Sequence, residues 1–307
     1  MRIVFLGKGG SGKTTTTAAF VKHLAKKIHV LAIDADVNVH LKQALNLKGD
    51  QKLLGENYRE ISKYVSGERK MDTEFIGTTP PNLKSKFIRP TKDDEFIKEF
   101  AIQKDNISLL TVGSYEQEDI GTTCYHGKLM GLETVAHHLL DDKTDWVVTD
   151  ATAGVDIGTS LFFAYDLNIF VVEPTLKSVN VFKDFLKFSN DNGLNTKCII
   201  NKYDTEDEEF INKHIPSNLI IGKLPSSKNI KRFEQGNIEA FEDYVQECNQ
   251  VFKEIEEESK KHSRDWDKYL ENLKTLHKKN SITWYNNYYS KKLETQIDEE
   301  FTYNLIT

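Results

Sequence analysis

The chain has 307 residues, of which 38% are hydrophobic, and a formal net charge of −6 at pH 7. This length exceeds that of most single domains, but one α/β domain with an extension accounts for it. No apolar run is long enough to span a membrane, and the net negative charge argues against general DNA binding, which depends on Lys and Arg at phosphates. The three cysteines, Cys124, Cys198 and Cys248, are too few and too scattered for a disulfide framework.

The N-terminal segment has the pattern of a core strand and not of a secretion signal, so we expect a cytoplasmic protein. Short apolar runs then alternate with helical patterns over most of the chain. This alternation predicts an α/β fold, a mostly parallel sheet with helices on both faces. The predicted strands are Ile3–Leu6, Val30–Ile33, Ile107–Val112, Trp146–Thr149, Leu167–Val172, Cys198–Ile200 and Leu219–Leu224. The segment Leu47–Asn106 is less regular, and we expect it to form a partly helical excursion over the sheet edge.

A glycine-rich run, Gly7-Lys8-Gly9-Gly10-Ser11-Gly12-Lys13-Thr14, lies between the first strand and a helical pattern that begins at Thr15. Glycines let successive backbone N–H groups point at phosphate oxygens, and the helix N-terminus adds its positive dipole end. Lys13 is expected to neutralise the β- and γ-phosphates, and the Thr14 hydroxyl to hold Mg²⁺. The run therefore predicts a P-loop that binds a nucleotide, with Thr15 as its last contributing residue.

Two carboxylates follow the second predicted strand, in the sequence Asp34-Ala35-Asp36. Ligands bind at the carboxyl ends of strands in a parallel sheet, so these side chains are expected near the P-loop. We assign Asp36 the role of orienting an attacking water, because it lies further out on the following loop. The alternative is structural, with Asp36 or Asn38 capping the next helix.

The strand that starts at Trp146 ends at Asp150, which we expect to hold Mg²⁺ together with Thr14. Gly154 follows four residues later, where its backbone N–H could meet a γ-phosphate and sense the nucleotide. An ordinary strand–turn–helix corner is the alternative interpretation of this segment.

A pocket for the nucleotide base is predicted beyond the sixth strand. Asn201 follows that strand, and its amide offers a donor and an acceptor to a purine edge. Pro225, after the next strand, is expected to line the same pocket. Asp204 would suggest guanine, but it also begins an acidic run, so the choice between ATP and GTP stays open.

We expect a P-loop ATPase domain in residues 1–250 and a C-terminal helical extension in residues 251–307. The extension and the residues just before it show helical spacing of apolar side chains, interrupted by the polar run Glu256–Arg264. This pattern predicts two helices or one long helix with an exposed middle. The aromatic-rich tail, Ser281–Thr307, is expected to pack on this chain or on a partner, such as an unknown client protein.

Lys8, directly after the first glycine, resembles the second lysine of the deviant Walker A loop in the MinD/ParA/ArsA/nitrogenase-iron-protein class of ATPases. The resemblance implies a homodimer with ATP between the subunits, in which Lys8 reaches the partner's phosphates. Asp34–Asn38 is similar to that class's Asp-x-Asp-Pro-x-x-Asn region, with Val37 in place of proline. Asp150–Asp156 is similar to the switch of the CooC-like branch, ATPases associated with nickel insertion into carbon monoxide dehydrogenase. The resemblance covers about residues 1 to 250.

Cys124 and His126 form a Cys-x-His pair where CooC-like proteins carry Cys-x-Cys. Two chains would supply two cysteines and two histidines, a tetrahedral set for zinc or nickel at the dimer interface. The alternative, in which Cys124 is a small buried residue and His126 an ordinary loop residue, stays equally open.

These features support three hypotheses on function. The first is a slow, Mg²⁺-dependent ATPase that acts as a nucleotide-switched homodimer in metallocentre maturation or partner-protein remodelling. The second is a positioning or partitioning ATPase that binds membrane or DNA, which the acidic C-terminal segment and the net charge disfavour. The third is a non-hydrolysing nucleotide sensor within a larger complex.

Overall fold

The fold was analysed in a computed structural model that describes residues 1–69, 75–115, 125–154 and 159–305. Its centre is an eight-stranded sheet with the order β3-β4-β2-β5-β1-β6-β7-β8. The strands are β1 Arg2–Gly7, β2 Val30–Asp34, β3 Ile102–Lys104, β4 Ile107–Thr111, β5 Trp146–Asp150, β6 Leu167–Val172, β7 Thr196–Tyr203 and β8 Ile220–Pro225. Every neighbouring pair is parallel except β3 with β4. The predicted α/β fold and each predicted strand are confirmed.

Among the residues that the structure describes, the antiparallel edge strand β3 is the one strand that the sequence analysis missed. Only Ile102 of its three residues is buried, while Gln103 and Lys104 are exposed. A short, mostly exposed strand carries almost no hydrophobic pattern, so its apolar signal is too weak to predict. Its pairing with β4 closes this end of the sheet.

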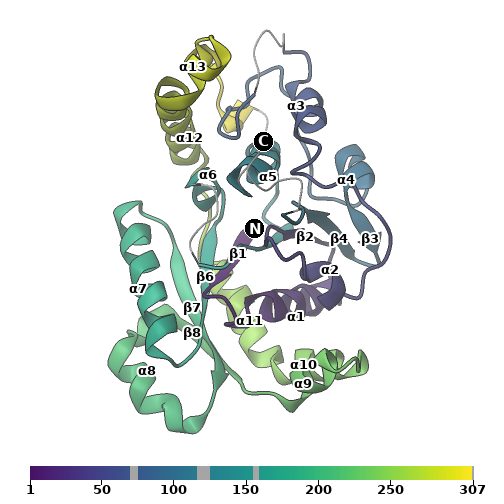
Figure 1. The fold of residues 1–307 in the computed structure, drawn as a ribbon, viewed down its shortest axis with the longest axis vertical. Helices are drawn as coiled ribbons and strands as arrows, with labels where there is room; N and C mark the ends of the chain where they lie inside the picture. Colours follow the sequence, from purple (N-terminus) through teal and green to yellow (C-terminus); the bar gives the residue numbers. More distant parts are fainter. Residues whose placement is uncertain (70–74, 116–124, 155–158, 306–307) are drawn as a thin grey trace.

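Helices cover both faces of the sheet, as predicted (Figure 1). In β1, Ile3 and Phe5 join one hydrophobic core, while Val4 and Leu6 join the other. Helices α1, α2, α10 and α11 contribute to the first core, and α3 to α7 with α12 contribute to the second. The helices are α1 Lys13–Ala25, α2 Leu41–Ala44, α3 Tyr58–Ser66, α4 Glu95–Phe100, α5 Tyr125–His138, α6 Thr159–Phe163, α7 Leu176–Asp191, α8 Glu208–His214, α9 Lys228–Glu234, α10 Glu239–Glu247, α11 Asn249–Ser259, α12 Trp266–Asn280 and α13 Asn286–Tyr289.

The C-terminal part forms separate helices that pack on opposite faces of the sheet. In α11, Phe252 is fully buried and contacts Phe20 of α1, with ring centroids 5.7 Å apart. A new helix, α12, begins after Asp265, whose side chain accepts a hydrogen bond from the Lys268 N–H. The interruption therefore falls where the polar run predicts it. The division of the chain at residue 250 stays a prediction, although α11 shares a core with β1.

The aromatic tail is partly buried and partly exposed. Phe301 and Tyr303 pack into the core beside α12, whereas Trp284 and Tyr288 are exposed. Within the described ranges, no helix is both long and apolar enough to cross a membrane.

We predict that Phe252→Ala lowers the free energy of unfolding by about 3–5 kcal/mol, because it removes a buried ring and leaves a cavity. Denaturant titration would measure this loss. The matched control is Trp284→Ala, which removes an exposed ring and should change stability by less than about 0.5 kcal/mol. Equal effects of the two substitutions would contradict the packing of α11 against α1.

Candidate functional site

A buried ammonium group lies between two carboxylates at the carboxyl edge of the sheet. The Nζ of Lys13, at the start of α1, is 2.9 Å from Asp36 Oδ2 and 2.9 Å from Asp150 Oδ1. Burial alone would lower the pKa of Lys13, but these two carboxylates outweigh it and raise that pKa. Burial alone would raise the pKa of Asp36, but Lys13 and the Asn38 N–H outweigh it and lower that pKa. The three predicted residues are thus brought together as one charged cluster.

Asp150, at the end of β5, also lies within hydrogen-bond distance of two hydroxyl groups. Thr14 Oγ1 donates a hydrogen bond of 2.6 Å to Asp150 Oδ2, and Thr17 Oγ1 lies 3.2 Å from Asp150 Oδ1. The side-chain oxygens of the predicted Thr14–Asp150 pair are therefore adjacent. Oxygen atoms are the ligands that Mg²⁺ prefers. Thr17 was not predicted to take part, although it follows Lys13 by one helical turn and so faces the same side.

Asp34 has a structural role that the sequence analysis did not assign. Its carboxylate accepts hydrogen bonds from the Asp36 N–H at 3.1 Å and from the Leu41 N–H, at the start of α2, at 2.9 Å. Asp34, and neither Asp36 nor Asn38, thus receives the N–H of that helix's first residue. Burial and the nearby Asp150 carboxylate raise the pKa of Asp34 to about 7. Asp34 is thus a third buried carboxyl group beside the cluster of Lys13, Asp36 and Asp150.

The end of β7 holds the glycine-rich loop in shape. Asn201 Nδ2 donates a hydrogen bond of 2.8 Å to Ser11 O, and Lys202 Nζ donates one of 2.8 Å to Gly10 O. Gly12 has φ 87°, and a Cβ at this position would lie 2.2 Å from Asn201 Nδ2. Only glycine therefore fits there. The two side chains from β7 thus bind the Ser11 and Gly10 carbonyl groups. These bonds stabilise the loop conformation that the glycines permit.

Lys202 is a residue of this site to which the sequence analysis assigned no role. It has φ 56°, which is unusual for a residue with a side chain, and its Nζ lies 2.6 Å from Glu173 Oε1. The other oxygen of Glu173 is 4.0 Å from the Nζ of Lys8, which donates to Gly9 O at 2.9 Å. The Nζ groups of Lys8 and Lys202 thus both bond carbonyl oxygens of the loop in the same chain.

Gly154 lies against the first glycine of the loop. Its N–H donates a hydrogen bond of 2.8 Å to Gly7 O, and its φ is 86°. The N–H that the sequence assigns to nucleotide sensing is therefore bonded to the P-loop in this structure.

A hollow of about 480 Å³ opens beside the loop, within the size range of small-ligand sites. Five residues predicted for the nucleotide base and the loop, Gly10, Gly12, Thr15, Asn201 and Pro225, line it together. Asp204 does not line this hollow, and its backbone N–H bonds Asp207 in a local cap. The remaining lining residues are Lys202, Ser226, Ser227, Ile230, Lys231, Glu234 and Tyr244.

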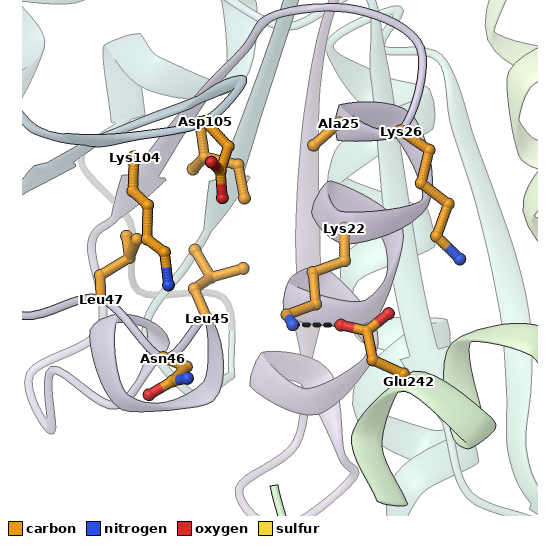
Figure 2. A pocket seen from close by; sticks show the side chains of 10 residues that line it. Lys22, Ala25, Lys26, Leu45, Asn46, Leu47, Lys104, Asp105 and Glu242 are labelled. Carbon is orange, nitrogen blue, oxygen red and sulfur yellow. Dashed lines mark hydrogen bonds and ion pairs between the residues drawn. The ribbon is translucent and has the colours of Figure 1, made fainter. Parts of the chain in front are cut away.

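A smaller hollow of about 200 Å³ lies at the opposite end of α1. Figure 2 shows Lys22 paired with Glu242 of α10 beside this hollow, with Lys104 extending toward it from the end of β3. None of the predicted site residues lines it, so it is distinct from the nucleotide hollow.

Of the predicted metal ligands Cys124 and His126, the structure describes only His126. Cys124 lies outside the described residues, and His126 is exposed in the first turn of α5. In the part of the chain that the structure describes, no group of three or more His, Cys, Asp or Glu residues is arranged to hold a metal ion. Zinc or nickel at this position stays a prediction.

A chain of buried hydrogen bonds lies behind α6, the helix that follows Gly154 in sequence. Ser160 of α6 donates to Glu133 of α5, and its Oγ is 3.2 Å from His137 Nε2. His137 Nδ1 in turn lies 2.5 Å from the hydroxyl of Tyr269 in α12. Burial lowers the pKa of His137 well below its usual value and raises the pKa of Glu133 to about 7. This chain connects α5 and α6 to α12.

The loop, the carboxylates and the sheet together define a P-loop nucleotide-binding protein. A model of the CobQ/CobB/MinD/ParA nucleotide-binding domain matches residues 3–241, and the chain belongs to this family. Two relatives from Methanocaldococcus jannaschii are each named as an uncharacterized ATP-binding protein. One is 30% identical over 239 residues, 76% of this chain and 90% of the relative. The other is 30% identical over 270 residues, 85% of this chain and 98% of the relative.

Two solved structures share the fold. A chain of the MinC:MinD cell division protein complex from Aquifex aeolicus has a TM-score of 0.55 at 18% identity, covering 83% of this chain and 95% of that one. The cell division ATPase MinD from Pyrococcus furiosus has a TM-score of 0.52 at 19% identity, covering 83% and 98%. At these identities the likeness establishes the fold alone.

We predict that Glu133→Gln becomes progressively more stable than the native chain as the pH rises from about 4.5 to 7, by up to about 3 kcal/mol. In this window the folded chain holds a proton on Glu133 that the unfolded chain has lost, so rising pH destabilises the native chain and not the variant. Urea titrations across this pH range would measure the difference. Glu271→Gln, at an exposed position, is the control, and parallel pH curves for Glu133→Gln and the native chain would contradict the burial of this carboxyl group.

Proposed function

We propose that this protein is a Mg²⁺-dependent ATPase that acts as a nucleotide-switched homodimer, in metallocentre maturation or in remodelling a partner protein. The observation that carries the proposal is the buried Lys13 ammonium between Asp36 and Asp150, at the start of a glycine-rich loop. ATP is the proposed nucleotide because relatives about 30% identical over most of the chain are named as ATP-binding proteins. The position of Asp204 outside the base hollow also favours adenine over guanine.

Phosphoryl transfer needs charge neutralisation and an attacking water in line with the bond that breaks. Lys13 can turn from the two carboxylates toward the phosphates, where its charge stabilises the negative charge that develops. Asp36, released from Lys13, would then accept a hydrogen bond from the attacking water and orient it. Thr14 and Asp150 would hold Mg²⁺, which neutralises phosphate charge when it is bound.

The switch proposal rests on the bond between the Gly154 N–H and Gly7 O. A γ-phosphate beside the loop offers this N–H a charged acceptor in place of a neutral carbonyl, and such hydrogen bonds are roughly twice as strong. Movement of Gly154 would displace α6, and Ser160 would pass the change to His137 and to Tyr269 of α12. The C-terminal helices are therefore the proposed output element.

The homodimer rests on the resemblance of the loop to the deviant Walker A class. In the single chain, Lys8 lies near Glu173 and is 35% exposed, so it is accessible to a second copy. The maturation role rests on the similarity of Asp150–Asp156 to the CooC-like switch, and residues 155–158 of that segment lie outside the described ranges.

We predict that ATP with Mg²⁺ converts Asp36→Ala from a monomer into a stable dimer, because the variant binds ATP but cannot orient the water. Adding Lys8→Ala should return it to a monomer, with dimer affinity weakened at least about tenfold. Light scattering with measurement of bound nucleotide would test this. Lys26→Ala, an exposed lysine at the far end of α1, is the control. A monomer under every condition would contradict the homodimer.

We also predict that the non-hydrolysable analogue AMPPNP changes amide hydrogen exchange in α12, and that Ser160→Ala removes this change while nucleotide affinity stays within about twofold. The physical reason is that Ser160 joins α6 to His137 and, through it, to Tyr269. Exchange in α9, which lies beside the base hollow, serves as the internal control and should respond in both proteins. An α12 response that persists in Ser160→Ala would contradict this route.

A further inference from the structure

One carboxylate, Glu173, lies beside two lysines that both bond the glycine-rich loop. Its Oε1 is 2.6 Å from the Nζ of Lys202, and its Oε2 is 4.0 Å from the Nζ of Lys8. Lys202 Nζ also donates to Gly10 O at 2.8 Å, and Lys8 Nζ donates to Gly9 O at 2.9 Å. Each ammonium group is therefore shared between a carbonyl oxygen of the loop and the same carboxylate.

The fold fixes the position of Glu173 at the carboxyl edge of the sheet. It directly follows β6, which lies between β1, the strand that leads into the loop, and β7, the strand that carries Lys202 (Figure 1). Its N–H donates a hydrogen bond of 3.0 Å to Ser178 Oγ in α7, and its carbonyl oxygen accepts one of 2.7 Å from the Thr175 N–H. Because this backbone is bonded on both sides, the carboxylate is held beside the loop.

The two ion pairs are weak enough for a ligand to replace them. The side chain of Lys202 is 51% exposed and that of Lys8 is 35% exposed. Water screens such pairs, so they contribute little to stability. A nucleotide polyphosphate carries several negative charges, against one on Glu173, and hydrogen bonds from an ammonium group to phosphate oxygens are strong. A polyphosphate at the loop would therefore draw the lysines away from Glu173.

The hollow beside the loop shows where this exchange would take place. Lys202 lines it together with Gly10 and Gly12 of the loop. A ligand with several phosphate groups along the loop would come within reach of both ammonium groups and would have to separate them from the carboxylate. A nucleoside in the same hollow carries no phosphate charge and would leave both ion pairs intact.

We propose that Glu173 is a positioning residue that competes with the nucleotide's phosphates for Lys8 and Lys202. In this structure it holds both ammonium groups at the loop, and a polyphosphate binds by taking them over. Glu173 thus lowers the affinity for nucleotides in proportion to their phosphate charge, so that bound nucleotide is released more readily. The inference rests on the proposed function only in placing the nucleotide's phosphates at the loop.

The test compares Glu173→Gln with the native chain by calorimetric titration of adenosine, AMP, ADP and AMPPNP in the presence of Mg²⁺. We expect the variant to bind ADP and AMPPNP about three- to tenfold more tightly, because two partly exposed ion pairs no longer compete. Adenosine and AMP should bind the two proteins within about twofold of each other, because they bring little or no phosphate charge to the lysines. A purely structural effect of the substitution would change all four affinities alike.

Glu95→Gln is the matched control. Glu95, in α4, pairs with Lys86 at 2.7 Å, so this substitution also removes one carboxylate from a lysine pair, but none of the loop residues takes part. It should bind all four ligands within about twofold of the native chain. Thermal unfolding of each variant verifies that it is folded.

The double variant Lys8→Gln/Lys202→Gln separates competition for the lysines from simple repulsion of the phosphates. In this background, adding Glu173→Gln should tighten ADP binding by less than about twofold, because neither ammonium group is left to release. An undiminished gain would overturn the inference, since the carboxylate would then act on the phosphates directly. Unchanged or weaker ADP binding by the single variant Glu173→Gln overturns it as well, and so does an equal gain for adenosine.

Dimer formation, measured by light scattering on the same proteins, separates this inference from the proposed function. A gain in ADP affinity in a chain that AMPPNP never converts into a dimer leaves the inference standing and removes the homodimer. A dimer that forms with AMPPNP while Glu173→Gln shows no gain sinks this inference alone. A native chain that binds none of the four ligands overturns both.

Discussion

The site depends on one interaction, the contact of the Lys13 ammonium with Asp36 and Asp150. These residues come from three different elements, α1, the loop after β2 and the end of β5, so this contact fixes how the three meet. Without the lysine, buried carboxylates would face one another uncompensated, which is strongly unfavourable. Burial, together with the nearby Asp150 carboxylate, also raises the pKa of Asp34 to about 7, because its charged form is disfavoured there. The lysine contact is therefore what holds Asp36 and Asp150 together at this edge of the sheet.

The same region connects the loop to distant parts of the chain through short contacts. Asn201 holds the loop from β7, and Gly154, in the segment after β5, bonds it through its N–H. Further along the chain, Ser160 of α6, His137 of α5 and Tyr269 of α12 form a chain of buried contacts. Under the proposed switch, movement of Gly154 would reach α12 through this chain.

The sequence alone predicts a feature correctly where the chemistry of the residues and the local hydrophobic pattern indicate the same structure. The parallel strands were predictable because buried strands form continuous apolar runs, and Asp150 was predictable because it ends one of them. Other features depend on partners far apart in sequence. The sequence places Asp36 further out on the loop than Asp34, but only the fold shows that Asp34 receives the Leu41 N–H. The Ser160–His137–Tyr269 chain was equally hidden, because a buried polar residue and an exposed one are identical in sequence.

The central claim is that the nucleotide takes over the contacts that Lys13 and Gly154 make in the free chain. A crystal structure of the chain with AMPPNP and Mg²⁺ tests this most directly. The account predicts that the Lys13 Nζ leaves Asp36 for the phosphates and that the Gly154 N–H leaves Gly7 O for the γ-phosphate. Bound nucleotide with both of the original contacts still in place would contradict it.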